Sequence, residues 1–546
     1  MPPLLPNIDD LSLAEQVAQM VIVRASGYLF DQQIQYPQWE PPSATLRSWI
    51  SEWGVGGVIL LGGSAAELAL RTQQLQTWAP VPLLMAADVE EGVGQRFAGA
   101  TWFPPPMALA EIASTNLVQA EQYAQQMGAI TAQEARGIGL NWVLAPVVDV
   151  NNNPDNPVIN VRSFGETPTI VSHLTTAFIR GAQTHPVLTV AKHFPGHGDT
   201  ATDSHLDLPV IPHSQERLTQ LELLPFQAAI AAEVDSVMSA HLLIPELDAD
   251  YPATLSQPIL TQLLRQTLGF EGLIVTDALV MGAIADRYGV NQASVLAVAA
   301  GADVLLMPAD PVGTIQAVCQ AVEDGVIPPA RIRASVERIW WAKQKVCAPL
   351  LEETTSHAWE DPPIGLETEP FTARLAQPAA TNLVNEILQQ SLRVQQPGVS
   401  RLSASLGMEN CRNLIIVDEA LSQEGWGQQT PAITIPKALG YQLQVIDRHT
   451  PAIPLNLENQ PWQATLLQLV IRGNPFRGSA GLNQTAQNWL QFLLQTEQLQ
   501  ALVIYGSPYI LEKFLPSLPP DIPYVFTYGQ MPAAQAIALN TLFGQA

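Results

Sequence analysis

The segment Val187–His205 reads VLTVAKHFPGHGDTATDSH and joins an apolar run to the densest group of titratable side chains in the chain. The first part, Val187–Ala191, is typical of a buried strand. The second part, Lys192–His205, contains one lysine, three histidines and two aspartates. Gly196 and Gly198 disfavour a helix there and let the backbone turn sharply or approach another group closely. Because α/β enzymes place their chemistry on loops that leave the C-terminal ends of strands, we interpret this segment as the site of a reaction.

The composition describes a globular protein of more than one domain. The chain has 546 residues, of which 47% are hydrophobic and 14% charged. Its formal net charge of −25 argues against nucleic acid or an anionic membrane as a partner. The three cysteines are far apart and suggest reduced structural thiols, not a zinc site or a disulfide framework. The first ten residues do not resemble a signal peptide, and no apolar run approaches the roughly 18 residues that span a bilayer. We therefore expect a cytoplasmic protein.

Short apolar runs alternate with segments of helical periodicity over about the first 310 residues. Eight such runs are typical of strands: Met20–Val23, Gly57–Leu61, Val81–Ala87, Trp142–Val148, Val187–Ala191, Asp235–Ala240, Leu273–Thr276 and Asp303–Met307. Eight strands with helical connections favour a (β/α)8 TIM barrel over an open sheet.

Polar side chains follow these runs where each run ends. Asp88 ends the third, Asp149 the fourth, Lys192 and His193 the fifth, His241 the sixth and Asp277 the seventh. The C-terminal ends of the strands form the face on which barrels carry their active sites, so this distribution predicts an enzyme.

A second, smaller domain follows the barrel. We expect the barrel over residues 1–347, a linker rich in Pro, Glu and Thr over residues 348–375, and an α/β sandwich over residues 376–546. Its apolar runs indicate a largely parallel sheet: Asn413–Val417, Gln442–Ile446, Ala464–Ile471, Ala501–Tyr505 and Pro523–Thr527. No glycine-rich nucleotide motif follows these runs, so we expect no nucleotide cofactor.

Two groups at the barrel face suit acid–base or nucleophilic chemistry. Asp277 ends an apolar strand, where a carboxylate serves either as a nucleophile or base at the pocket floor or as the N-cap of the next helix. Asp203 and His205 can meet in an irregular loop, where the carboxylate would hold the ring and raise its pKa. Arg96 and Arg162 follow strand-end loops, and with Lys192 and Asp88 they could bind the hydroxyls of a sugar, although each arginine could equally be an ordinary surface residue.

Several separated motifs together resemble family 3 glycoside hydrolases, and more narrowly their β-N-acetylglucosaminidase branch. Along the chain they are Asp88–Phe97, Arg162–Gly165, Lys192–Gly198, Asp203–His205 and Thr276–Asp277, which is the order that family has. The resemblance covers roughly residues 10–345 and implies a retaining enzyme that removes terminal β-linked N-acetylglucosamine, with no cofactor or metal. It also implies muropeptide fragments of peptidoglycan, cut during cell-wall recycling, as substrates.

The resemblance also implies roles for individual residues. Asp277 takes the position of the nucleophile, His205 that of the acid/base and Asp203 that of its partner. His197 matches a residue that shapes the loop. Five residues take substrate-binding positions: Asp88, Arg96, Arg162, Lys192 and His193. The chain departs from the common pattern at Glu91, where many members have Gly, and at Ala278, where many have Asp.

Four alternatives remain open from the sequence. Within the same family these are a β-glucosidase and an N-acetylglucosaminide phosphorylase, because a neutral His205 would not repel phosphate. In other classes they are a metal-dependent barrel hydrolase and a non-catalytic sugar-binding protein. This chain lacks the HxH that metal-dependent barrel hydrolases usually have after strand one. The intact set Asp277, Asp203 and His205 argues against a non-catalytic sugar-binding protein. The oligomeric state and the task of the second domain are left open.

Overall fold

Eight short parallel strands close into a barrel in the computed structural model of the chain. The structure describes residues 5–201, 208–347, 374–396, 410–420, 425–450, 464–472 and 483–544. The strands are β1 (Val21–Ser26), β2 (Gly57–Leu61), β3 (Leu84–Ala87), β4 (Trp142–Val143), β5 (Leu188–Phe194), β6 (Ser236–Ser239), β7 (Leu273–Thr276) and β8 (Leu305–Leu306). Neighbours pair in the order β7-β6-β5-β4-β3-β2-β1-β8, and a parallel bridge between Val275 and Val304 brings β7 to β8. The predicted (β/α)8 barrel is confirmed.

Helices surround this barrel. They are α1 (Leu13–Gln19), α2 (Ser43–Ser51), α3 (Ala65–Trp78), α4 (Met107–Ala113), α5 (Leu117–Gly137), α6 (Pro168–Ala182), α7 (Gln215–Gln220), α8 (Leu223–Ala231), α9 (Gly282–Tyr288), α10 (Val290–Ala300), α11 (Pro311–Glu323) and α12 (Pro329–Cys347), with a π-helical turn at Pro258–Thr267. The first begins with a capping box, in which Ser12 and Glu15 satisfy each other's backbone N–H groups. The strands are buried almost throughout, so their apolar runs form the core between sheet and helices.

Several strands end at positions other than those expected: the first, for example, ends at Ser26 and not at Val23. The differences in the fifth and fourth strands bear on the site. The fifth continues through Lys192 and His193 to Phe194, because Lys192 still pairs with Met238 and Phe194 with Ser239 across a register shift. These two residues therefore lie in the strand and not after it. The ladder of the fourth strand is continuous only at Trp142 and Val143, although the apolar run continues to Val148. Pro146 has no N–H for a ladder and interrupts the strand, and the buried segment pairs with β5 again through a bridge between Val147 and Lys192.

The second domain is a six-stranded sheet covered by helices on both faces. The strand order is β11-β10-β12-β13-β14-β9, and β9 alone runs antiparallel, at the edge. The strands are β9 (Arg393–Gln395), β10 (Cys411–Val417), β11 (Gln442–Ile446), β12 (Ala464–Ile471), β13 (Leu499–Gly506) and β14 (Tyr524–Thr527). The helices are α13 (Pro378–Gln390), α15 (Pro431–Ala438), α16 (Asn483–Gln495), α17 (Pro508–Phe514) and α18 (Pro532–Phe543). The predicted α/β sandwich is confirmed.

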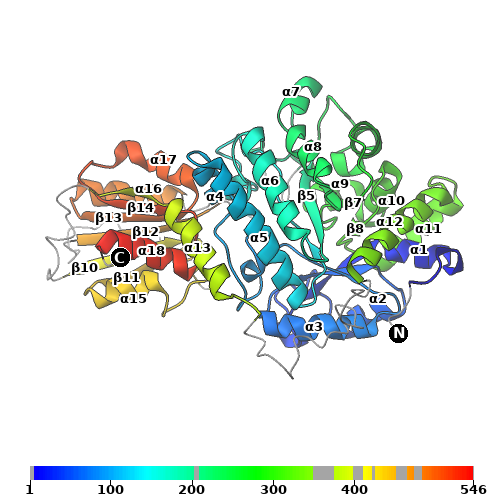
Figure 1. Cartoon of the computed structure of the whole chain (residues 1–546), viewed down its shortest axis with the longest axis horizontal. Coiled ribbons are helices and arrows are strands. Elements are labelled where there is room, and N and C mark those ends of the chain that lie inside the picture. Colours follow the sequence, from blue (N-terminus) through cyan, green and yellow to red (C-terminus); the bar gives the residue numbers. More distant parts are fainter. Residues whose placement is uncertain are drawn as a thin grey trace.

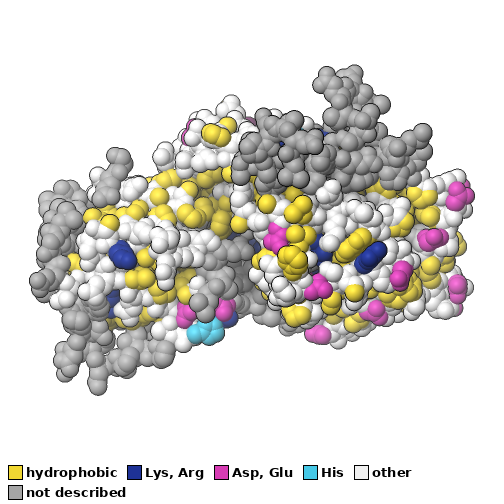
Figure 2. Space-filling model, turned by 90° about the horizontal axis from the view of Figure 1, so that it is seen from below, with side chains coloured by type: hydrophobic (Ala, Val, Ile, Leu, Met, Phe, Trp, Pro, Cys, Tyr) yellow, Lys and Arg dark blue, Asp and Glu magenta, His cyan; other side chains and the backbone are white. Residues whose placement is uncertain are grey.

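The two sheets lie side by side, and α13 lies between the second sheet and the barrel helices α4 and α5 (Figure 1). Most of the expected linker, residues 348–373, lies outside the described residues. In the face seen in Figure 2, acidic side chains are scattered along the barrel and basic ones are sparse, in keeping with the net charge of −25. Across the described ranges, no helix is both long and apolar enough to cross a membrane.

Candidate active site

The segment after β3 brings two carboxylates to the C-terminal end of the barrel. Asp88 follows the strand directly, and Glu90 lies two residues further on, with the fully buried Val89 between them. The Asp88 side chain is 37% exposed, whereas that of Glu90 is only 4% exposed. A carboxylate as buried as that of Glu90 needs cations or hydrogen-bond donors close by.

Lys192 supplies a cation to both carboxylates. Its Nζ lies 2.8 Å from Asp88 Oδ1 and 2.6 Å from Glu90 Oε1, and its side chain is 1% exposed. Burial by itself lowers the pKa of Lys192, but the two carboxylates outweigh burial, so the pKa is raised. Lys192 is therefore charged at neutral pH.

Arg162 supplies the second cation, from the 3-10 turn η4 (Asn160–Arg162). Its Nε and Nη2 donate to Glu90 Oε2 and Oε1, both at 2.8 Å, in a bidentate pair. Its Nη1 donates to the carbonyl oxygen of Val158 at 3.0 Å. Burial raises the pKa of Glu90, but Arg162 and Lys192 more than offset burial and hold it well below its usual range. Glu90 is therefore an anion, neutralised on two sides.

Asp149 organises the end of β5 from a buried position in the irregular segment after β4. Its carboxylate accepts the backbone N–H of His193 at 3.1 Å and that of His197 at 2.7 Å, and it lies 2.8 Å from His193 Nδ1. Burial raises the pKa of Asp149, but the histidines and these hydrogen bonds outweigh it and lower the pKa. The carboxylate therefore fixes both the backbone and the His193 ring.

The two glycines of this segment are needed for close approach. A Cβ on Gly198 would lie 1.7 Å from the carbonyl oxygen of Val150. Gly196 has φ +131°, and a Cβ there would lie 2.8 Å from Cβ of Glu222. Any other residue at either position would push the segment away from its neighbours.

His197 is buried beside this segment and is neutral. Its Nδ1 lies 3.1 Å from Thr200 Oγ1, and burial lowers the pKa of His197 to about 4. Asp149 and Asp277 are among the charges that raise this pKa, but burial outweighs them. His197 is therefore part of the packing beneath the loop.

Asp277 directly follows β7 at the same end of the barrel. Its N–H donates to the Ser239 carbonyl at 3.2 Å, and its Oδ1 accepts the N–H of Ala278 at 2.7 Å. The following helix, α9, begins at Gly282 with Met281 as its N-cap, so Asp277 does not cap that helix. His241, buried nearby, lies 3.1 Å from the Ala278 carbonyl through its Nε2 and so steadies the backbone after Asp277.

The expected site residues are only partly within the described chain. Asp88, Lys192 and Arg162 form one connected set through Glu90, and Arg96 joins it by donating from Nε to the Asp88 carbonyl at 3.0 Å. His193, the residue after Lys192, pairs separately with Asp149. Asp203 and His205 lie outside the described residues.

The sequence reasoning did not name Glu90 or Asp149 as members of the site. Alternation would have indicated Glu90, since Asp88 and Glu90, two residues apart in an extended segment, point to the same side. Asp149 was noted only as the end of a strand. Its hydrogen bonds to a segment more than forty residues away leave no local signal in the sequence.

One cluster has the residue types of a metal site. Asp199, His213 and Glu222 place ligand atoms within 4.8 Å of one another. Arg217 lies in the same cluster, however, and its Nη2 is 2.9 Å from Asp199 Oδ2 and 3.4 Å from Glu222 Oε1. His213 Nε2 lies 2.8 Å from that same Asp199 oxygen. The guanidinium already compensates the carboxylates, so we assign no metal here.

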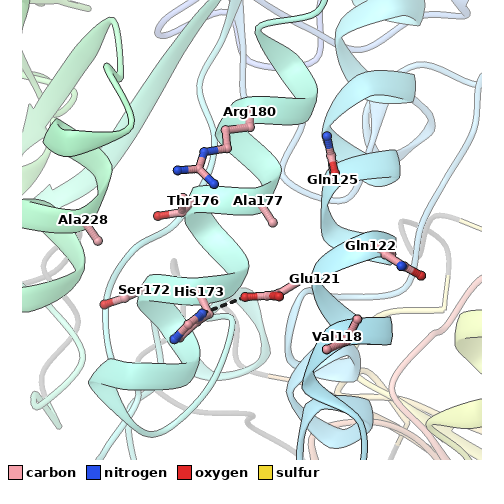
Figure 3. Close-up of a pocket in the computed structure, with 10 residues that line it drawn as sticks. All are labelled: Val118, Glu121, Gln122, Gln125, Ser172, His173, Thr176, Ala177, Arg180 and Ala228. Atoms are coloured by element: carbon pink, nitrogen blue, oxygen red, sulfur yellow. Dashed lines mark hydrogen bonds and ion pairs between the residues drawn. The ribbon is translucent and has the colours of Figure 1, made fainter.

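A separate groove of about 590 Å³ lies on the outside of the barrel between α5 and α6 (Figure 3). His173 and Glu121 face each other across it, with Nδ1 and Oε1 2.7 Å apart. None of the site residues lines this groove. Its size therefore does not identify it as the active site, because the ion-paired set around Glu90 and the carboxylate of Asp277 lie at the barrel end instead.

Both parts of the chain match known family domains. Residues 12–342 match the glycosyl hydrolase family 3 N terminal domain, and residues 405–544 match the bacterial glycosyl hydrolase family 3 C-terminal domain. The chain therefore belongs to glycoside hydrolase family 3.

The chain is similar to two curated relatives and to one solved structure of the same family. A β-hexosaminidase A from Pseudoalteromonas piscicida is 39% identical over 49% of this chain and 48% of its own length. A β-N-acetylglucosaminidase/β-glucosidase from Cellulomonas fimi is 34% identical over 52% of this chain and 51% of its own length. The chain thus matches about half the length of each. A solved family 3 β-N-acetylglucosaminidase from Paenibacillus sp. str. FPU-7 is 30% identical, covers 98% of this chain and 97% of its own, and has a TM-score of 0.76.

Proposed function

We propose that this protein is a retaining β-N-acetylglucosaminidase that removes terminal β-linked N-acetylglucosamine. The observation that carries the proposal is the ion-paired set of Asp88, Glu90, Lys192 and Arg162 at the same barrel end as Asp277. Such a set can fix several sugar hydroxyls beside a carboxylate nucleophile. The Paenibacillus relative, similar over almost the whole of both chains, supports the choice of sugar.

The reaction would proceed by double displacement. Asp277 attacks the anomeric carbon and forms a glycosyl ester, while protonated His205 gives its proton to the leaving oxygen. Neutral His205 then takes a proton from water, whose oxygen attacks the anomeric carbon and releases Asp277 as a carboxylate. Asp203 would hold the ring of His205 in the required tautomer. The family motif supports the roles of Asp203 and His205, which lie outside the described residues.

The exposed fractions of the side chains suggest which residues contact the sugar and which also hold other site residues. Asp88, with a side chain 37% exposed, would accept hydrogen bonds from sugar hydroxyls. Arg96 would donate to sugar oxygens, and His193 would also contact the sugar. Lys192 and Arg162 have side chains that are 1% and 15% exposed. They would act both on the sugar and on the two carboxylates that they neutralise.

The natural substrates would be muropeptide fragments of peptidoglycan, cleaved in the cytoplasm during cell-wall recycling. Such fragments are acidic, whereas the chain carries a net charge of −25. Binding would then depend on the local cations Arg96, Arg162 and Lys192 and would weaken as salt screens them.

Hydrolysis of paired chromogenic substrates tests the proposal. p-Nitrophenyl β-N-acetylglucosaminide and β-glucoside would be offered to the wild type and to Asp277→Ala, with and without a chelator. We expect cleavage of the first substrate alone, insensitive to the chelator and lost in the variant. Preference for the glucoside would overturn the choice of sugar, and loss with the chelator would favour a metal-dependent hydrolase. Faster sugar release with added phosphate would indicate a phosphorylase.

A further inference from the structure

Both barrel segments that build the Glu90–Arg162 pair also contact the second domain. One segment runs from Asp88 to Phe103 and carries Glu90, and the other runs from Asn151 to Glu166 and carries Arg162. Each meets one long polar side chain of the sandwich, Arg472 or Tyr509.

Arg472 follows β12 directly and reaches the residue next to Glu90. Its Nη2 donates to Glu91 Oε1 at 2.7 Å, and Glu91 is only 1% exposed. The other carboxylate oxygen, Oε2, accepts the indole N–H of Trp102 at 3.0 Å. The backbone is held too, because the Glu91 carbonyl accepts the N–H of Phe103 at 2.8 Å. Glu91 is therefore a buried anion whose cation comes from the other domain.

The second domain also packs on Trp102. Gly425 has φ +73°, and a Cβ there would lie 3.0 Å from Cζ3 of that indole, so the glycine backbone lies directly against the ring. The indole that donates to Glu91 is thus held between the two domains.

Tyr509, in α17, makes the corresponding contact on the other segment. Its hydroxyl accepts from Asn151 Nδ2 at 2.8 Å and donates to Glu166 Oε1 at 2.6 Å. Asn151 Oδ1 in turn accepts the N–H of Asn160, the first residue of the turn that ends at Arg162. The contact is therefore one hydrogen bond removed from the turn that presents Arg162.

We propose that Arg472 is a positioning residue of the active site: through the buried carboxylate of Glu91 it fixes the segment that carries Asp88, Glu90 and Arg96. The sandwich then completes the site by holding barrel loops, without itself supplying a reacting group. Glu91 occupies a position where the family motif often has glycine, so this pair is a feature of this chain and not of the motif.

Hydrogen–deuterium exchange and kinetics on the full chain test this assignment. Arg472→Ala removes the cation, and Arg472→Lys keeps it. Arg393→Ala is the matched control. Arg393 of β9 forms an ion pair with Glu111 of α4, so this substitution also removes a contact between the same two domains. The kinetic part rests on the proposed β-N-acetylglucosaminidase activity, whereas the exchange measurement does not.

We expect faster exchange in the peptide covering residues 88–103 of Arg472→Ala and unchanged exchange there in Arg393→Ala. KM for the aryl β-N-acetylglucosaminide should rise about tenfold or more in Arg472→Ala, with a smaller change in kcat, since a displaced binding loop is costly. Arg472→Lys should restore most of the loss. A variant that is merely less stable would instead lose active enzyme, which lowers kcat and leaves KM unchanged.

A double-mutant comparison shows whether Arg472 acts through Glu91. In a Glu91→Gln background, Arg472→Ala should change KM by less than about twofold, because the Glu91 carboxylate that Arg472 binds is already gone. Equal effects of Arg472→Ala in both backgrounds would overturn the inference, as would unchanged exchange in residues 88–103. An inactive wild type would overturn the proposed function, and the exchange result would still decide the role of Arg472.

Discussion

Glu90 is the residue on which the charges of the site converge. It is 4% exposed and is held by a bidentate guanidinium on one side and an ammonium on the other. Lys192 continues the chain of charges to the more exposed Asp88. Removing one member would leave a buried charge uncompensated. A replacement that keeps the charge would still lose those hydrogen bonds that depend on the shape of the side chain.

Arg162→Lys tests that geometry. Lysine keeps the positive charge but cannot make the two parallel hydrogen bonds at 2.8 Å, so kcat/KM should fall by about tenfold or more. Arg24→Lys is the control, because Arg24 also pairs with a buried glutamate, Glu40, but does not contact the site set. Steady-state kinetics of both variants measure this change in kcat/KM. A loss of the same size in Arg24→Lys would show that general destabilisation explains the result.

His197 should make stability depend on pH. Its pKa is lowered to about 4 by burial, whereas an unfolded histidine titrates near 6.5. Between these values the unfolded chain binds the additional proton, so the free energy of unfolding falls as pH falls, by about 2 kcal/mol from pH 6.5 to 5. His197→Gln should remove that part of the slope in urea unfolding. An identical slope in the variant would contradict the buried, neutral ring.

At the level of elements, the sequence predicted the strands better than their ends. Asp277 lies directly after β7 as expected, because an apolar run ends there and the ladder ends with it. Lys192 and His193 instead continue β5, since the carboxylates of Asp88, Glu90 and Asp149 make their burial possible. Local pattern cannot predict such burial, because the compensating groups come from other strands. β9 was not predicted because its three residues form no apolar run and pair only with β14.

The cluster of Asp199, His213 and Arg217 joins the residues that flank the segment 202–207. Asp199 and His213 lie on either side of residues 202–207, and Arg217 bonds to Asp199. Because His205 is the proposed acid, Arg217→Ala should lower kcat more for N,N′-diacetylchitobiose than for the p-nitrophenyl glycoside, which needs little protonation of its leaving group. Arg333→Ala, which removes an exposed pair with Glu337, is the control. Equal losses on both substrates would show that the cluster does not act on the acid step.

At the scale of the whole molecule, stability and chemistry lie at opposite ends of the barrel. Asp303, just before β8, is fully buried and bonds to three arginines: Arg265 at 2.7 Å, Arg331 at 3.2 Å and Arg338 at 3.2 Å. It also accepts the N–H of Ile274 at the start of β7. This cluster lies at the N-terminal face, where barrels carry stabilising contacts.

Asp303→Asn should therefore lower stability without changing substrate binding. Removing the charge leaves three guanidinium groups close together, and breaking a buried ion pair costs about 3–5 kcal/mol. Thermal unfolding should show a lower Tm, whereas KM of the folded fraction should equal that of the wild type. An increase in KM would mean that the two ends of the barrel are not independent.

The second domain was predicted as a sandwich, but its contacts with the barrel were not. Arg472 and Tyr509 meet residues more than three hundred positions away in the sequence, and neither belongs to a motif. A single sequence gives no sign of such pairs. The structure shows them, and they suggest how the sandwich contributes to a barrel site.

In the proposed reaction, Asp277 forms a covalent bond to the sugar. The most direct measurement is peptide mass spectrometry after reaction with a slow substrate, a 5-fluoro-N-acetylglucosaminyl fluoride, whose intermediate accumulates. We expect one added sugar on the peptide that contains Asp277, and none in Asp277→Ala. A sugar on another residue, or turnover with no adduct, would contradict it.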